Sequence, residues 1–182
     1  MRAWRALPLA ADAIAVSWRV DEPREAPALD LLAGLGCVAG PPGREVTRRC
    51  KRVSARWRPE QSATCVRVTW SDAARALRLE GRDAWGTWRP ARQLSTAALR
   101  TLTLAVLAED PTSRGLLLID DAAAGLDAAR VPALIRLAQR MVVDPTRAPA
   151  RDNPLRQIIT CSARPEVARA LLPHPHDALV AQ

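Results

Sequence analysis

The chain has 182 residues and a net charge of +8 at neutral pH, and its 27 basic residues include a single lysine, Lys51. A chain of this length forms one domain, or one domain with a small appendage, and it can build a hydrophobic core without disulfides or a structural metal. With 48% hydrophobic and 25% charged residues, the composition excludes collagen-like, disulfide-scaffold and highly charged disordered proteins.

Charge and aromatic residues both divide the chain near residue 90. Residues 1–92 carry a net charge of +7 (17 basic, 10 acidic) and all six tryptophans, whereas residues 93–182 carry +1 (10 basic, 9 acidic). The basic part either faces DNA or RNA through the arginine-rich residues 44–58, or is the solvated surface of an arginine-rich protein. No ladder of alternating aromatic and basic residues, as in single-strand binders, is visible in the sequence.

The cysteines and the apolar segments bear on localisation. None of the four cysteines forms a C-x-x-C pair, so metal-ligand spacing is absent. Reduced thiols are the default in the cytoplasm. Asp12 interrupts the N-terminal apolar run, and no stretch reaches the roughly 20 apolar residues of a membrane span. We therefore expect a cytoplasmic protein without a membrane partner.

Residues 1–62 are expected to form a poorly defined basic N-terminal segment. The apolar run at 28–38 predicts a short helix, which the Gly-Pro-Pro-Gly sequence at 40–43 ends. The composition favours low order at residues 20–30 and again at 40–50.

Residues 63–90 are predicted to form a β-hairpin or meander. Apolar and polar residues alternate at 63–70 and, less cleanly, at 75–80, and a Gly-Arg-Asp turn follows.

From residue 93 the pattern alternates between helices and strands. A Ser-Thr pair predicts an N-cap at 95–96, and an apolar run followed by two aspartates predicts a buried parallel strand. The expected elements are a helix from 96 to about 110, a strand at 116–119, a helix at 128–141, a strand at 157–161 and a helix at 165–172. This order predicts an α/β layered sheet.

Four short motifs follow one another in this half of the chain. They are RQLSTAALR at 92–100, LLLIDD at 116–121, AGLD at 124–127 and QIITCS at 157–162. In this order they resemble the signature, Walker B, D-loop and switch motifs of ABC-type ATPases, in the AAA/ABC group related to SMC, RecF and OLD proteins. The resemblance implies a partial P-loop NTPase fold, with residues 63–182 as an ABC-ATPase-like C-terminal lobe.

The resemblance assigns nucleotide chemistry to four residues. Asp120 would hold Mg²⁺, and Asp121 would take the place of the glutamate that polarises the attacking water, although its side chain is one methylene shorter. Ser95 and Asp127 would meet a nucleotide in trans, across a dimer of two heads. Each has a plain structural alternative, namely a strand end or helix cap for the acidic pair and an N-cap for Ser95 and for Asp127.

Departures from the family pattern limit the expected function. Cys161 or Ser162 stands where the family has its switch histidine, and the signature glycine is replaced around residues 96–97. No G-x-x-x-x-G-K-[ST] phosphate loop (Walker A) occurs, because the only lysine, Lys51, lies between a cysteine and an arginine. The Gly-Pro-Pro-Gly sequence at 40–43 is interpreted as a turn, not a phosphate loop.

We therefore expect a truncated or degenerate ATPase-family protein that is not catalytically competent alone. ATP and Mg²⁺ are implied by the resemblance only, and the expected partner is a second copy of the chain or a separate chain that bears Walker A. The alternatives are a non-catalytic protein- or nucleic-acid-binding module built on an ATPase-like lobe, and an unrelated α/β domain whose motifs match by chance.

Overall fold

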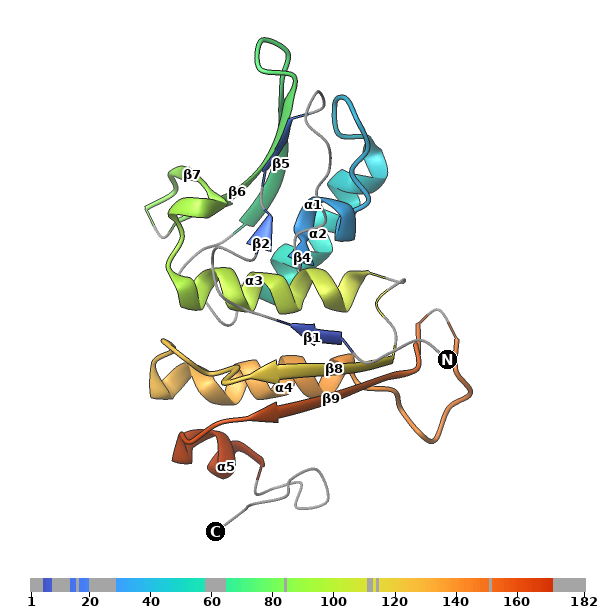
Figure 1. The fold of residues 1–182 in the computed structure, drawn as a ribbon, viewed down its shortest axis with the longest axis vertical. Helices are drawn as coiled ribbons and strands as arrows, with labels where there is room; N and C mark the ends of the chain where they lie inside the picture. The colour runs from blue at the N-terminus through green and yellow to red at the C-terminus, as the bar shows by residue number, and fades with distance from the viewer. Residues whose placement is uncertain are drawn as a thin grey trace.

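The computed structural model describes residues 5–7, 14–15, 17–19, 29–57, 65–83, 85–110, 113, 115–150 and 152–171. Within these residues, helices pack against a parallel and an antiparallel sheet around one hydrophobic core (Figure 1). This is the predicted α/β architecture, with parallel strands and flanking helices preceded by a hairpin region. None of the described helices has the length and hydrophobicity needed to cross a membrane.

The parallel sheet has the strand order β1-β8-β9, so that β8 is central. Its strands are β1 (Arg5–Leu7), β8 (Gly115–Asp120) and β9 (Arg156–Cys161). Asp120 lies opposite Cys161 in the register. Strands β8 and β9 confirm the two predicted strands, whereas the pairing of β1 with β8 had no sequence signal.

The antiparallel sheet confirms the predicted hairpin. Strand β5 (Cys65–Ser71) pairs with β6 (Ala76–Arg82), and β6 also pairs with β3 (Ser17–Arg19) and β7 (Trp88–Pro90). Alternate residues of β5 and β6 are buried against the core, as expected for a sheet with one solvated face. A separate short pair joins β2 (Ile14–Ala15) to β4 (Leu29–Asp30).

The helix α3 (Thr96–Glu109) lies between the two sheets (Figure 1). It is buried on nearly every side from residue 98 to residue 107, so it forms the centre of the core. The other predicted helices are also present. They are α1 (Leu31–Gly34), α4 (Val131–Met141) preceded by the 3₁₀ turn η3 (Ala128–Arg130), and α5 (Pro165–Leu171).

Helix α2 (Arg44–Trp57) corrects one prediction. Low order was expected at 40–50, yet residues 44–50 are helical, because Val46, Cys50 and Val53 recur at helical spacing and bury one face. Residues 20–28 lie outside the described residues. The division of the chain at residue 63 stays a prediction, although described parts before it contribute strands to both sheets and side chains to the core.

Candidate functional site

Asp120 and Asp121 lie where the central parallel strand ends. Asp120 is the exposed last residue of β8, and Asp121 opens the following turn with a φ of +40°, a left-handed conformation that few residues other than glycine adopt. Ligands of open α/β sheets bind outside the carboxyl ends of the strands. Both aspartates therefore lie at the edge of the sheet where such ligands bind.

The end of the neighbouring strand provides one hydrogen-bond donor for each aspartate. The Cys161 thiol donates to Asp120 Oδ1 (Sγ to Oδ1, 3.0 Å), and the Ser162 hydroxyl donates to Asp121 Oδ1 (2.9 Å). Cys161 and Ser162, the two candidates for the switch position, therefore both contact the acidic pair, and each one binds a different carboxylate. Neither donor is a basic side chain, so the pair has no cationic partner from this segment.

Two arginines fix the backbone of the turn after the acidic pair. Arg100 of α3 donates Nη1 to the carbonyl of Asp121 (2.9 Å), and Arg164 donates Nη1 to the carbonyls of Ala123 (2.8 Å) and Leu126 (2.6 Å). Arg100 is the last residue of the signature-like motif, and its place in that motif was the only indication in the sequence that it could belong to the site. No sequence pattern pointed to Arg164.

The signature-like and D-loop-like motifs lie next to each other. Gly125 has a φ of +75°, and a Cβ atom added there would lie 3.8 Å from the Cβ of Ala97 in the first turn of α3. Ser95 is the N-cap of α3, and its Oγ accepts a hydrogen bond from the Ala98 amide (3.2 Å). The capping role of Ser95 is therefore present, and its role toward a nucleotide stays a prediction.

Asp127 lies at the other end of this turn. It occupies the N-cap position of η3 but makes no side-chain capping bond. Its side chain is 78% exposed, with Oδ2 3.7 Å from Nε of Arg130. A contact of Asp127 with a second head stays a prediction.

The carboxylate oxygens of the acidic pair are ligands that suit a Mg²⁺ ion shared with a phosphate. Mg²⁺ prefers oxygen ligands and usually takes only one or two protein carboxylates, with water and phosphate oxygens completing its shell. Among the described residues, no group of three or more His, Cys, Asp or Glu side chains is placed to hold a metal ion. Two carboxylates at the end of a strand are compatible with such a shared ion.

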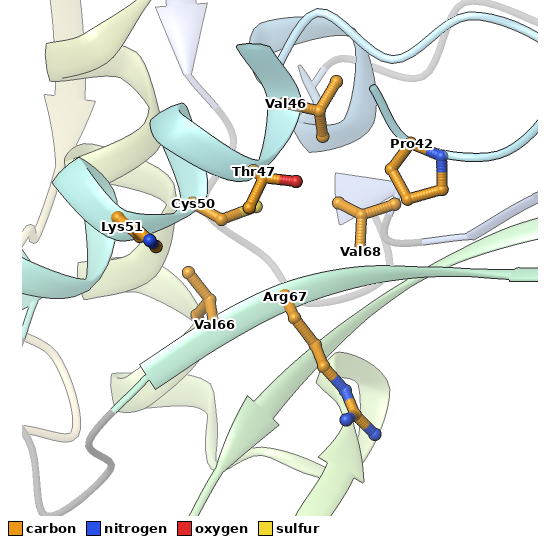
Figure 2. A pocket seen from close by; sticks show the side chains of 8 residues that line it. All are labelled: Pro42, Val46, Thr47, Cys50, Lys51, Val66, Arg67 and Val68. Atoms are coloured by element: carbon orange, nitrogen blue, oxygen red, sulfur yellow. The ribbon is translucent and has the colours of Figure 1, made fainter. Parts of the chain in front are cut away.

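A small pocket lies beside the Gly-Pro-Pro-Gly turn, between α2 and β5 (Figure 2). It has a volume of about 170 Å³ and a mainly apolar lining that includes Val46, Cys50 and Val68. Burial raises the pKa of the Cys50 thiol to about 11. The Thr47 hydroxyl donates to the carbonyl of Gly43 (3.2 Å), so it already has a partner within the first turn of the helix. These features describe an apolar hollow and favour the interpretation of the Gly-Pro-Pro-Gly sequence as a turn.

Four arginines of α2 have carboxylate partners inside the fold. Arg52 and Arg56 each contact Glu109 of α3, at 2.6 and 2.5 Å between Nε and a carboxylate oxygen. Arg48 and Arg49 contact Glu45, at 3.6 and 3.4 Å. The Arg49 and Arg52 side chains lower the pKa of the Glu45 carboxyl, with Arg52 contributing most. Two carboxylates, those of Glu45 and Glu109, therefore offset part of the charge of this basic helix.

Comparison with solved structures relates this fold to a known one. The Smc head domain of Pyrococcus furiosus, with an extended coiled coil and bound to the C-terminal domain of ScpA, matches with a TM-score of 0.50 and 14% identity, over 70% of this chain. The chain is similar in fold to Smc head domains. The fold is therefore the one that the four ATPase-like motifs predicted.

Two further Smc heads match with TM-scores of 0.48. One is an Smc head bound to the C-winged helix domain of ScpA (14% identity, 69% of this chain), and the other is the Smc head with a coiled coil and joint from Pyrococcus yayanosii (15% identity, 70% of this chain). The matched region spans 31% of the P. furiosus chain, 38% of the ScpA-bound head and 24% of the P. yayanosii chain. No family model and no curated protein matches the sequence.

Proposed function

We propose that the chain is the signature and Walker B side of an ABC-type nucleotide site, and that it does not hydrolyse ATP alone. The observation that carries the proposal is the acidic pair at the carboxyl end of β8, with one donor from the end of β9 on each carboxylate. This arrangement forms at the edge of the sheet where a nucleotide phosphate would lie.

Each residue of the acidic pair has a separate role in this proposal. Asp120 would hold Mg²⁺, because its carboxylate is exposed at the strand end. Asp121 orients the attacking water, and its hydrogen bond to Ser162 fixes the direction of its carboxylate. Bound ATP would provide the phosphoanhydride bond that is cleaved, and Mg²⁺ would stabilise the negative charge that develops on the phosphate oxygens during cleavage. Ser95 and Asp127 would contact a nucleotide held by a second head.

A partner chain that bears a phosphate loop is part of the proposal. The only lysine, Lys51, lies on α2, which packs against β5 and α3, whereas the acidic pair ends β8. Parallel sheets are normally covered on both faces, yet the Ile159 side chain on β9 is 57% exposed. This exposed sheet face supports a covering partner. A second copy would again lack the loop, so a separate chain fits better.

Two further parts of the proposal concern partners and location. Two of the matched Smc heads are bound to domains of ScpA, which supports a protein partner for this chain as well. The four cysteines show no metal-ligand spacing, and thiols are reduced by default in the cytoplasm, where we therefore place the chain.

A non-catalytic binding module is the second candidate. It is favoured by the cysteine and serine at the switch position and by the shorter carboxylate of Asp121, since both weaken the case for hydrolysis. DNA or RNA binding through residues 44–58 would use the positive charge that remains on α2, because only Glu45 and Glu109 offset its basic residues among the described ion pairs. Residue 58 lies outside the described residues.

Mn²⁺ provides a test of the acidic site that does not depend on catalysis. Added to isotopically labelled protein, this paramagnetic substitute for Mg²⁺ should selectively broaden the amide signals of residues 120, 121 and 162. The Asp120→Asn variant should lose most of this broadening, because one of the two carboxylates is removed. Asp152→Asn is the control, since Asp152 is an exposed carboxylate in a loop. Equal broadening at all exposed carboxylates, or no effect of Asp120→Asn, would contradict the proposed site.

A further inference from the structure

The loop between β6 and β7 holds a tryptophan almost entirely in solvent. Trp85 is 86% exposed, the largest value among the exposed large hydrophobic side chains of the described residues. Tryptophan is highly buried on average, and where it lies at a surface it is enriched in binding sites. Its exposure therefore needs an explanation beyond the folding of the chain.

The loop that carries Trp85 is fixed by its own hydrogen bonds. Asp83 Oδ1 accepts from the amides of Trp85 (3.0 Å) and Thr87 (2.8 Å), and Asp83 Oδ2 accepts from Nε of Arg89 (2.7 Å). The Arg89 guanidinium holds the pKa of the Asp83 carboxyl below its usual range. These bonds hold the backbone that carries Trp85, which lowers the backbone entropy lost when a ligand binds.

Arginine side chains lie beside this loop and on the adjoining strands β5 and β6. Arg82 donates Nε to the carbonyl of Gly86 (2.9 Å), and no Nη hydrogen bond joins it to another described residue. Arg78 lies on the same face of β6, because it is four residues before Arg82, and it makes no ion pair with any described residue. On β5, Arg67 lies over the Trp88 ring at 4.1 Å.

The buried side chains of β5 and β6 face the other way. Figure 2 shows Val66 and Val68 beside α2, while the Arg67 side chain extends away from that helix. The solvated side of the sheet, with Arg67, Arg78 and Arg82, is therefore basic, and Glu80, which pairs with Arg67, only partly offsets its charge. We call these three arginines, together with Trp85, the Trp85 face.

We propose that the Trp85 face binds single-stranded nucleic acid, with a base stacked on the Trp85 indole and phosphates held by Arg82 and Arg78. Such proteins combine basic groups that follow the backbone with an aromatic ring that accepts any base. The arginines around the ring favour a polyanion over an apolar protein partner. This surface differs from the basic helix α2, and it lies across α3 from the parallel sheet (Figure 1), so it is independent of the ATPase proposal.

Binding of a fluorescein-labelled oligo(dT) of about 16 nucleotides tests the proposal by fluorescence anisotropy. Trp85→Ala should weaken binding by about 5-fold to 100-fold, since one stacked base is lost, and Trp85→Phe should restore part of it. Arg78→Gln should weaken binding and reduce its salt dependence, because one phosphate contact is removed. Each variant is compared with the unchanged chain by circular dichroism, because all of these side chains are exposed and the fold should be retained.

Two control variants test whether binding depends on this surface rather than on α2, and on the aromatic ring rather than on any apolar side chain. Arg48→Gln removes one charge from α2, where the Arg48 side chain is 68% exposed, and it should weaken binding less than Arg78→Gln. Trp85→Leu keeps an apolar side chain without a ring face, and it should bind as weakly as Trp85→Ala. Unchanged binding by Trp85→Ala, full binding by Trp85→Leu, a larger loss from Arg48→Gln, or no binding by the unchanged chain would each overturn the proposal.

Discussion

Replacing Arg156 with methionine should lower the free energy of unfolding by about 3–5 kcal/mol. Arg156 is only 2% exposed, and its guanidinium donates to the carbonyls of Ser113 (2.6 and 2.9 Å), Asp110 (3.2 Å) and Met141 (3.5 Å). Burial lowers the pKa of this guanidinium. Methionine fills a similar volume but donates no hydrogen bond, so buried carbonyl groups lose their donors.

The same residue positions the candidate site. Arg156 is the first residue of β9, and its hydrogen bonds connect this strand to the ends of α3 and α4. It therefore helps to fix the position of β9, the strand whose last residue, Cys161, contacts Asp120. Urea unfolding of Arg156→Met measures the effect. Arg147→Met is the matched control, because Arg147 is an exposed loop residue paired with Asp152 and should cost about 0.5 kcal/mol or less. Equal stability of the two variants would show that the buried bonds contribute little.

Replacing Leu102 with alanine should lower the free energy of unfolding by about 2–5 kcal/mol. Leu102 is fully buried on α3, the helix that lies between both sheets (Figure 1), and the removed methyl groups leave a cavity. Leu155→Ala is the matched control, since Leu155 is 59% exposed and should change stability by about 0.5 kcal/mol or less.

Two spectroscopic signals show whether α3 joins the two halves into one unit. Most of the tryptophans lie on the antiparallel sheet, in its β6–β7 loop or on α2, namely Trp18, Trp57, Trp70, Trp85 and Trp88. Tryptophan fluorescence therefore reports mainly on that half of the chain, and far-ultraviolet circular dichroism reports on all helices. Both signals should shift together in Leu102→Ala, as in a cooperative transition. A shift of one signal alone would contradict a shared core.

The sequence predicted the regular elements of the second half well, because local patterns determine them. The apolar run of β8 followed by two aspartates placed the acidic pair at a strand end, and the Ser-Thr pair at 95–96 marked the start of α3. The helix α2 was missed because its arginines obscured the buried positions Val46, Cys50 and Val53. Its apolar spacing was present in the sequence, so the error lay in the interpretation.

Other features could not be predicted, because they depend on contacts between distant residues. Nothing near Arg156 in the sequence indicates that backbone carbonyls far along the chain will surround it. The contact of Cys161 and Ser162 with different aspartates depends on the register of β8 and β9. The basic surface around Trp85 was also missed, because its residues come from separate strands and do not alternate along the chain.

The most direct test of the proposed function is ATP hydrolysis by the purified chain in Mg²⁺, measured beside Asp120→Ala. Because the sequence lacks a phosphate loop and the acidic pair provides only one side of a nucleotide site, we expect both proteins to show the same background rate. Magnesium-dependent hydrolysis that Asp120→Ala abolishes would contradict a lobe that needs a partner chain.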